Sequence, residues 1–446
     1  MYKADINEII THYNSECIEF IREHQDKALE PLILNGKWPS KLPKAFVIDQ
    51  IKVRKKLRSK VPEWAHNYQL ILPPEHNFQQ SSSQWTASYK ADLSDCDVVL
   101  DGTGGMGVDS YYFSCLGKKV IYVEKNSFLF AIASFNFRQL GVDIEVINAG
   151  VEEVLSSKSG TYAALQGRLK SARSLLYLDP SRKVNHQKIY DLSDAEPRVY
   201  KLWPYLRSLF HELLIKASPM ANIEESTIEG VHASRVQAVS INNELKELLY
   251  EYKFEDSENS KQQLIAVDIQ KNNHEPGHVC SLEYSQDLGL SLGDIHHSYP
   301  DTNTLEGNAG FMVEDEPRSG FLYDPLVAVK KLDLMDELIK MYPVTKMHPS
   351  THIYYSNTYL SDFPGRIFTL VDGFSPNNKA VKKWLSQEGV ACINVWAHNY
   401  PESTSTLKKR FRLEDGGSRF MIFTKTHHGR HWLWIADLET KPYARP

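Results

Sequence analysis

The sequence lacks the features that mark membrane and secreted proteins. No apolar run approaches the roughly 20 residues that a membrane-spanning helix needs. The N-terminus, "MYKADINEII", has no basic segment followed by an apolar one, which a signal peptide would show. We therefore expect a cytoplasmic chain that has no membrane partner.

Cysteine is scarce and scattered. The chain has 5 cysteines, an odd number, and none forms a C-x-x-C pair. This pattern argues against a disulfide framework and against a cysteine-based zinc site. The histidines of "THHGRH", His427 and His428, are adjacent in a turn and have no partner cluster at ligand spacing. The sequence therefore predicts no metal site.

Positive charge is in deficit overall but not everywhere. The net charge of −5 does not indicate a nucleic-acid-binding protein. However, residues 363–446 carry 13 Lys and Arg against 7 Asp and Glu, whereas residues 1–362 carry 38 against 49. A basic tail on an acidic body favours a polyanionic partner for the tail.

A length of 446 residues indicates several domains. Residues 1–95 have helical periodicity. In residues 96–272, short apolar strands alternate with helical stretches, and 242–252 is expected to be one of these helices. This pattern predicts an α/β fold with a doubly wound, mostly parallel, Rossmann-like sheet. Residues 273–362 form a less regular linking region, and 363–446 read as a small α+β domain.

The stretch "VVLDGTGGMGVDS", residues 98–110, predicts a nucleotide pocket. Gly102, Gly104 and Gly107 fit G-x-G-x-x-G, a spacing that occurs in dinucleotide-binding loops. Asp101 directly precedes the first glycine and would repel a pyrophosphate. A cationic ligand such as S-adenosylmethionine is therefore favoured, with a dinucleotide as the alternative.

Two further strand ends support a nucleoside site. Glu124 ends the next strand, where a carboxylate can bind both ribose hydroxyls. The alternative is that Glu124 is merely a solvated acid at the end of a strand. The strand "SLLYLDPSR" ends at 179–182, where a substrate would meet the transferred group. Pro180 would stiffen this turn. The alternative is that Asp179 and Pro180 merely terminate a strand.

Together these motifs resemble class I S-adenosylmethionine-dependent methyltransferases. "LDGTGGMGVDSYYFS", "YLDPSR" and "LLIKASPM" are similar to one bacterial branch, which carries a C-terminal THUMP-like domain. In its Bacteroidetes-type members a ferredoxin-like insert precedes that domain. The tail segments "NNKAVKKWLSQEGV" and "LKKRFRLEDGGSRFMIFTK" resemble the THUMP-like domain.

The resemblance implies roles for individual residues. Glu124 is the expected ribose ligand, and Asn148 stands where an aspartate often contacts adenine. Asp179 and Pro180 are the expected catalytic residues, although "DPSR" departs from the motif of exocyclic-amine methyltransferases, which has a second proline and an aromatic residue. The expected cofactor loop comprises Asp101, Thr103, Gly105 and Gly107, with Thr103 in place of the usual first glycine.

The resemblance also implies where the substrate binds. Trp85 and Lys90 would cover the pocket from the N-terminal side, with ordinary packing as the alternative for Trp85. Arg182 would contact a phosphate or pair with a surface acid. In the tail, the cations Lys408, Arg410 and Arg412 would dock RNA, with a solvated helix face as the alternative.

We therefore expect a methyltransferase that modifies RNA. An RNA-binding protein with a degenerate methyltransferase domain is the second hypothesis. A methyltransferase for proteins or small molecules is the third, and a dinucleotide oxidoreductase the last.

Overall fold

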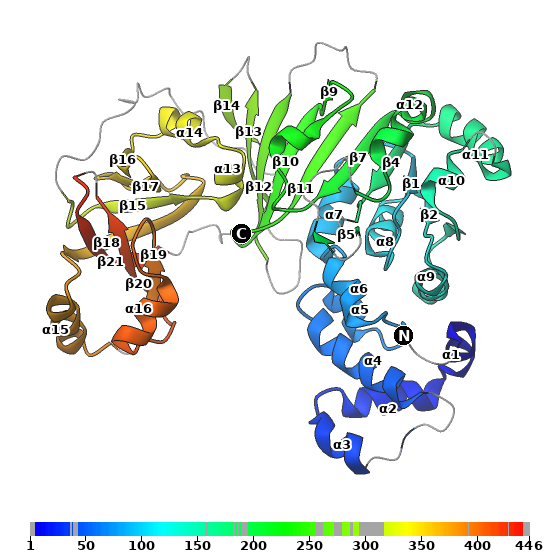
Figure 1. Cartoon of the computed structure of the whole chain (residues 1–446), viewed down its shortest axis with the longest axis horizontal. Coiled ribbons are helices and arrows are strands. Elements are labelled where there is room, and N and C mark those ends of the chain that lie inside the picture. The colour runs from blue at the N-terminus through cyan, green and yellow to red at the C-terminus, as the bar shows by residue number, and fades with distance from the viewer. Residues whose placement is uncertain are drawn as a thin grey trace. The chain divides into compact units, whose positions relative to one another are not determined.

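The computed structural model describes residues 5–35, 38, 43–156, 159–181, 183–184, 187–188, 195–254, 262–271, 279–285, 289–293, 316–390, 392–426 and 428–439. The chain forms two compact units (Figure 1). The first comprises Met1–Gln237, Glu247–Gln262 and Lys271–Gly277. The second comprises Ala238–Lys246, Gln263–Gln270 and His278–Pro446. In the part that the structure describes, no helix is long and apolar enough to cross a membrane.

The first unit begins with short helices, because polar caps and prolines interrupt the apolar periodicity. Asp5 and Asn14 each accept a hydrogen bond from a helix N-terminus, so the stretch from residue 5 to 24 divides into two helices. Buried apolar residues of these helices pack against Ile132. The helices are α1 (Ile6–His12), α2 (Ser15–His24), α3 (Leu29–Asn35), α4 (Lys44–Leu57), α5 (Pro62–His66), α6 (Glu75–Gln80) and α7 (Gln84–Asp92).

Next in the chain come strands of a larger sheet, in which six lie in the order β11-β7-β4-β1-β2-β3. All neighbours are parallel except β11, which is antiparallel to β7. The order reverses at β1, so the carboxyl ends of β1 and β4 flank a crevice. The strands are β1 (Val98–Asp101), β2 (Lys119–Val123), β3 (Ile144–Ile147), β4 (Ser174–Leu178), β7 (Glu212–Ala217) and β11 (Glu244–Lys253).

Helices and short elements connect these strands. The helices are α8 (Val108–Cys115), α9 (Ser127–Leu140), α10 (Val151–Val154), α11 (Gly160–Ser171) and α12 (Val199–Leu209), with a 3-10 turn at Ile223–Ser226. Two small hairpins are formed by β5 (Lys183–Val184) with β6 (Gln187–Lys188) and by β8 (Thr227–Ile228) with β9 (Val231–His232).

The helix expected at 242–252 is wrong, because this segment is strand β11. Asn242 and Asn243 have φ values of 49° and 62°. Two successive residues at positive φ form the tight turn of a β-hairpin and cannot begin an α-helix. The turn joins β10 (Arg235–Ile241), which crosses the sequence boundary between the two units, to β11.

The second unit also contains β12 (Gln263–Ile269), β13 (Val279–Ser285) and β14 (Gly289–Gly293), which are antiparallel neighbours. Its other sheet has the order β16-β17-β15-β18-β21-β20-β19. The strands are β15 (Phe321–Pro325), β16 (Thr345–His348), β17 (Thr351–Ser356), β18 (Gly365–Phe374), β19 (Asn394–Ala397), β20 (Arg419–Lys425) and β21 (His431–Leu438).

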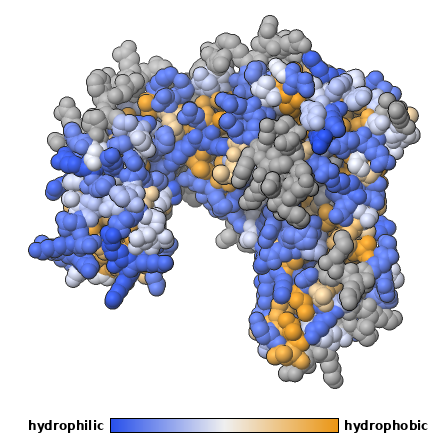
Figure 2. All heavy atoms as spheres, in the orientation of Figure 1, coloured by the Kyte–Doolittle hydropathy of each residue, from blue (hydrophilic) through white to orange (hydrophobic). Residues whose placement is uncertain are grey.

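The helices of the second unit are α13 (Val327–Lys331), α14 (Met335–Met341), α15 (Asn378–Glu388) and α16 (Thr404–Phe411). Val381 of α15 and Leu407 of α16 share a core with Met421 and Leu433 of the sheet. The tail therefore forms the α+β arrangement that its alternating periodicities indicate. Its surface around α15 and α16 is mostly hydrophilic (Figure 2).

Candidate functional site

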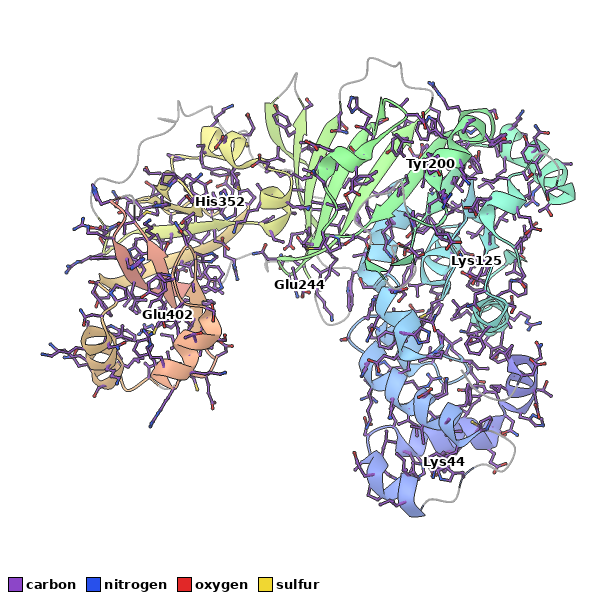
Figure 3. The ribbon with its side chains drawn as sticks, in the orientation of Figure 1. Lys44, Lys125, Tyr200, Glu244, His352 and Glu402 are labelled. Atoms are coloured by element: carbon purple, nitrogen blue, oxygen red, sulfur yellow. The ribbon has the colours of Figure 1, made fainter. Side chains whose placement is uncertain are left out.

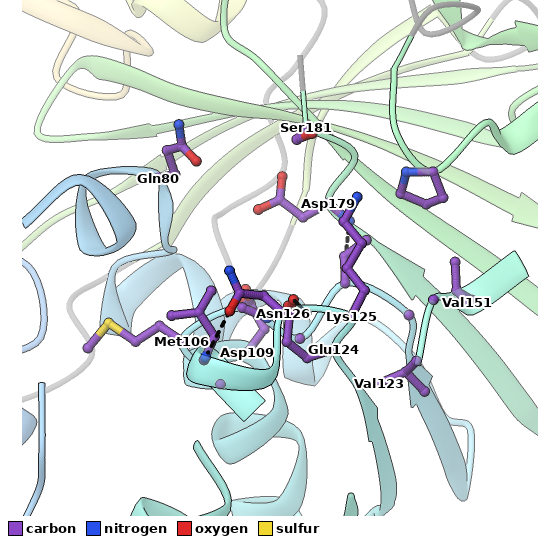
Figure 4. A pocket seen from close by; sticks show the side chains of 18 of the residues that line it. Gln80, Met106, Asp109, Val123, Glu124, Lys125, Asn126, Val151, Asp179 and Ser181 are labelled. Carbon is purple, nitrogen blue, oxygen red and sulfur yellow. Dashed lines mark hydrogen bonds between the residues drawn. The ribbon is translucent and has the colours of Figure 1, made fainter. Parts of the chain in front are cut away.

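A cavity of about 280 Å³ lies in the first unit, where the parallel strands end. Its walls include Gly102–Asp109, residues 123–126 at the end of β2, residues 149–152 after β3, and Asp179 and Ser181 after β4. Gln80 and Asp179 lie along one side, while Glu124 and Asn126 lie on the other (Figure 4). A cavity at this position in an α/β sheet is the expected place for a ligand.

The glycine loop is pressed against β2. A Cβ atom on Gly104 would lie 2.1 Å from the ring of Tyr122, so only glycine fits there. Gly107 has a φ of 86° and begins α8, which also favours glycine. The Tyr122 hydroxyl donates a hydrogen bond of 2.8 Å to the Gly105 carbonyl oxygen. These contacts hold the loop backbone along the cavity.

Asp101 supports the loop from beneath and is not among the residues that line the cavity. It is 1% exposed and accepts hydrogen bonds from the Thr103 N–H (3.1 Å) and the Ser110 hydroxyl (2.6 Å). Burial raises the pKa of Asp101 to about 7. Its carboxyl group therefore orders the backbone of the loop. The sequence had suggested instead that Asp101 would attract a cationic ligand.

Glu124 lines the cavity and orders the backbone around it. Its Oε2 accepts a hydrogen bond of 2.8 Å from the Gly105 N–H, and its Oε1 one of 2.7 Å from the Asn126 N–H. Asn148 does not line the cavity; its side-chain amide donates to the Glu124 carbonyl oxygen at 2.7 Å. Ala149 and Gly150 take the place beside the cavity where Asn148 was expected.

The ends of β1 and β4 are joined directly. The Asp179 N–H donates a hydrogen bond of 2.6 Å to the Thr103 hydroxyl, so Thr103 has a function that glycine could not supply. Pro180 is buried behind Asp179 and Ser181, which both line the cavity. Arg182, expected to bind substrate, lies outside the described residues.

Asp179 forms an ion pair with Lys216, at the end of β7. Burial alone would lower the pKa of Lys216, but the carboxylates of Asp179, Glu247 and Asp109 raise it above its ordinary value. Lys216 is therefore a cation at neutral pH.

Lys90 lies beneath the cavity and does not cover it. Its side chain is 0% exposed, and its Nζ lies 3.0 Å from Asp109 Oδ1 and 2.9 Å from Glu247 Oε1. Burial would raise the pKa of Asp109, but Lys90 and Lys216 hold it below its ordinary value. The expected substrate contact of Lys90 is therefore replaced by a buried ion-pair network.

Trp85 also lies away from the cavity wall. It is 7% exposed, and the Lys271 ammonium lies 4.1 Å from its ring centroid. The structure thus places Trp85 in ordinary packing. The N-terminal region still contributes to the cavity, but through Asn77, Gln80 and Ser81.

The sequence analysis missed Asp109, Lys216 and Glu247. One signal was available, because a lysine inside the apolar run "LLIKAS" is unusual in a buried strand. The meeting of Lys90 with Glu247, 157 residues apart, could not be inferred from spacing.

The cations expected to dock RNA lie on or beside α16. Lys408 forms an ion pair with Asp415, and Arg410 with Glu402, which is labelled in Figure 3. Arg412 ends the helix with a φ of 56° and is exposed. Within the described ranges, no group of three or more His, Cys, Asp or Glu residues is arranged to hold a metal ion.

Comparisons with known proteins agree with this architecture. Residues 365–438 match the THUMP domain-like family, and residues 321–364 match a ferredoxin-like domain family. A crystal structure of a candidate methyltransferase from Porphyromonas gingivalis W83 has a TM-score of 0.71 and 23% identity. The similarity covers 95% of this chain and 98% of that protein.

A curated relative is the ribosomal RNA small subunit methyltransferase J of Shewanella denitrificans. It is 34% identical over 104 residues, which span 23% of this chain and 41% of the relative. These findings confirm the predicted fold: a methyltransferase-type α/β sheet followed by ferredoxin-like and THUMP-like parts. The resemblance to the bacterial branch with a C-terminal THUMP-like domain is confirmed with it.

Proposed function

We propose that this protein is an S-adenosylmethionine-dependent methyltransferase that modifies RNA, and that its THUMP-like domain docks the RNA. The cavity between the glycine loop and Glu124 is the observation that carries this proposal. The name of the Shewanella relative, a ribosomal RNA methyltransferase, supports RNA as the substrate.

The residues present fit this cofactor. Glu124 lies where it would bind the ribose hydroxyls, and Ala149 and Gly150 would lie beside the adenine. The backbone of Thr103, Gly105 and Gly107 would hold the methionine part. The cofactor, when bound, supplies an activated methyl group. Asp179, with Pro180 behind it, would face the methyl acceptor.

The same proposal assigns the domains. Residues 1–95 form an N-terminal helical region and 96–272 the methyltransferase domain. Residues 273–362 form the ferredoxin-like and linking region, and 363–446 the THUMP-like domain. The family matches at 321–364 and 365–438 support the last boundary. Lys408, Arg410 and Arg412 would contact RNA phosphates there.

Calorimetry with S-adenosylmethionine, followed by transfer of its radiolabelled methyl group, tests the proposal. We expect binding, and labelling of total cellular RNA but not of protein. Glu124→Gln should weaken cofactor binding at least about tenfold, because it loses hydrogen bonds to a charged acceptor. Glu145→Gln, on β3 in an exposed ion pair with Arg168, should bind like the wild type. An RNA-binding protein with a degenerate site would bind no cofactor, and a protein methyltransferase would label protein.

A further inference from the structure

Helix α12 begins at the edge of the cavity. Glu196 and Pro197 line the cavity, and the helix begins two residues later, at Val199. It ends at Leu209, shortly before β7, whose parallel pairing with β4 places its first residue at the opposite edge of the sheet. The 11 residues of α12 span about 16 Å at the usual rise of an α-helix. Its outer face therefore extends from the cavity across the surface of the first unit.

Two tyrosines project from this outer face. Tyr200, which is labelled in Figure 3, is 38% exposed, and Tyr205 is 43% exposed. Tyr359 of the second unit is exposed to a similar degree, but its ring packs against Phe321 with the ring centroids 5.3 Å apart. In the described part of the chain, neither tyrosine of α12 contacts another aromatic ring. No aromatic neighbour therefore competes with a ligand for stacking on these two rings.

The same face is positively charged. Residues 198–210 contain three cations and no Asp or Glu. The cations Arg198, Lys201 and Arg207 are exposed, and Lys201 has no ion-pair partner among the described residues. Lys201 precedes Tyr205 by four residues, so the ammonium group and the ring are neighbours on the helix surface. The face thus combines cations with aromatic rings.

The acids near the start of α12 are already engaged. Glu196 forms an ion pair of 2.7 Å with Lys125, on the other side of the cavity. Glu152 Oε1 accepts a hydrogen bond of 3.2 Å from the Arg198 N–H. Since the Lys125 ammonium offsets the charge of Glu196, this acid repels a polyanion less than a free carboxylate would.

We propose that the outer face of α12 binds a single-stranded segment of the RNA substrate, next to the nucleotide that enters the cavity. Tyr200 and Tyr205 would stack on bases, while Lys201 and Arg207 would contact phosphates. Stacking on an aromatic ring is possible for every base, so this surface would hold the strand without reading its sequence. This inference rests on the proposed function, and it adds that the methyltransferase domain itself holds RNA beside its cavity.

Photocrosslinking and fluorescence anisotropy with the full chain test this surface. The probe is a fluorescein-labelled oligouridylate of about 12 nucleotides, which contains 4-thiouridine for crosslinking. We expect crosslinks within residues 198–208. Replacement of Tyr200 and Tyr205 together by alanine should weaken binding about fivefold or more at unchanged salt dependence, because base stacking is lost. Replacement of both by phenylalanine keeps the rings and should bind within about twofold of the wild type.

The charge of the face is tested separately. Lys201→Met should lower the dependence of log K on log salt by about one charge. The matched control is Lys52→Met, an exposed lysine on α4 that does not line the cavity, and it should leave binding unchanged. Crosslink mapping uses the wild type, so it tests the surface even if a variant fails to fold.

Two results would overturn the proposal and leave the proposed function intact. One is wild-type binding by the folded alanine variant, and the other is a set of crosslinks confined to the second unit. If no RNA bound to the chain at all, both this proposal and RNA as the substrate would be refuted.

Discussion

Lys90 in the first unit and Lys408 on α16 differ in how much of the side chain is exposed to solvent. Lys90 is 0% exposed and touches two carboxylates that are themselves largely buried. Lys408 is 25% exposed, and its partner Asp415 is 59% exposed. Both lysines were expected to bind substrate. The difference in burial gives them different roles. Lys90 compensates buried carboxylates and so stabilises the fold, whereas Lys408 can exchange its exposed partner for a phosphate at little cost.

The largest expected effect is loss of the buried cation. Lys90→Met keeps the length of the side chain but removes the ammonium group that pairs with Asp109 and Glu247. We expect a loss of about 3–5 kcal/mol in the free energy of unfolding, measured with urea, because uncompensated buried charges are costly. A loss below about 1 kcal/mol would show that the carboxylates find other partners. Lys90 would then contribute no more to stability than an exposed lysine such as Lys408.

The next largest effect is expected from adding a side chain to the glycine loop where it is packed against Tyr122. Gly104→Ala places a Cβ atom 2.1 Å from the Tyr122 ring. We expect a loss of about 1–3 kcal/mol in stability, as for other overpacked sites, and weaker binding of S-adenosylhomocysteine. The control is Gly160→Ala, at the start of α11, where a Cβ atom meets nothing within 4 Å. Its stability should be unchanged or higher by up to about 1 kcal/mol. Equal effects of the two substitutions would contradict the tight fit.

Asp101 should make stability depend on pH. Its pKa is raised from 3.8 to about 7 in the folded state. Between these two values the unfolded chain loses the proton while the folded chain keeps it. The contribution of Asp101 to stability is therefore full below the lower value and falls as pH rises towards 7. Urea unfolding at several pH values across this range should show a fall in stability for the wild type that Asp101→Asn lacks. If the stability of both proteins varied with pH in parallel, the pKa of Asp101 would be ordinary.

The smallest expected effect is at the surface of α16. Lys408→Met should change the free energy of unfolding by less than about 1 kcal/mol, because exposed ion pairs contribute little. Its binding to RNA should weaken uniformly across sequences, and the dependence of log K on log salt should decrease by about one charge. Filter binding at several salt concentrations measures this. An unchanged salt dependence would place the RNA elsewhere.

Local pattern was enough to predict most of the fold. Apolar runs ending in Asp101, Glu124 and Asp179 mark strands because burial on both faces leaves little other choice. The same reasoning failed at β11, where "NNELKELLYEY" has good helix formers. There the turn at Asn242 and Asn243 and the buried faces of the strand overrode helix propensity.

The site was predictable in part, for a related reason. Glycine spacing and strand-end acids reveal which backbone segments meet at the sheet edge. They do not reveal which side chains point inward, so Asp101 and Lys90 were expected at the cavity and lie beneath it. Lys216 was missed because its partner, Asp179, is 37 residues away and on a neighbouring strand.

The hydrogen bond from the Asp179 N–H to the Thr103 hydroxyl has an evolutionary consequence. A relative with glycine at the position of Thr103 must satisfy that N–H in another way, since leaving a partly buried donor without a partner is costly. The two positions should therefore vary together among relatives. Where Thr103 is replaced by glycine, we expect the turn after β4 to change its residues as well.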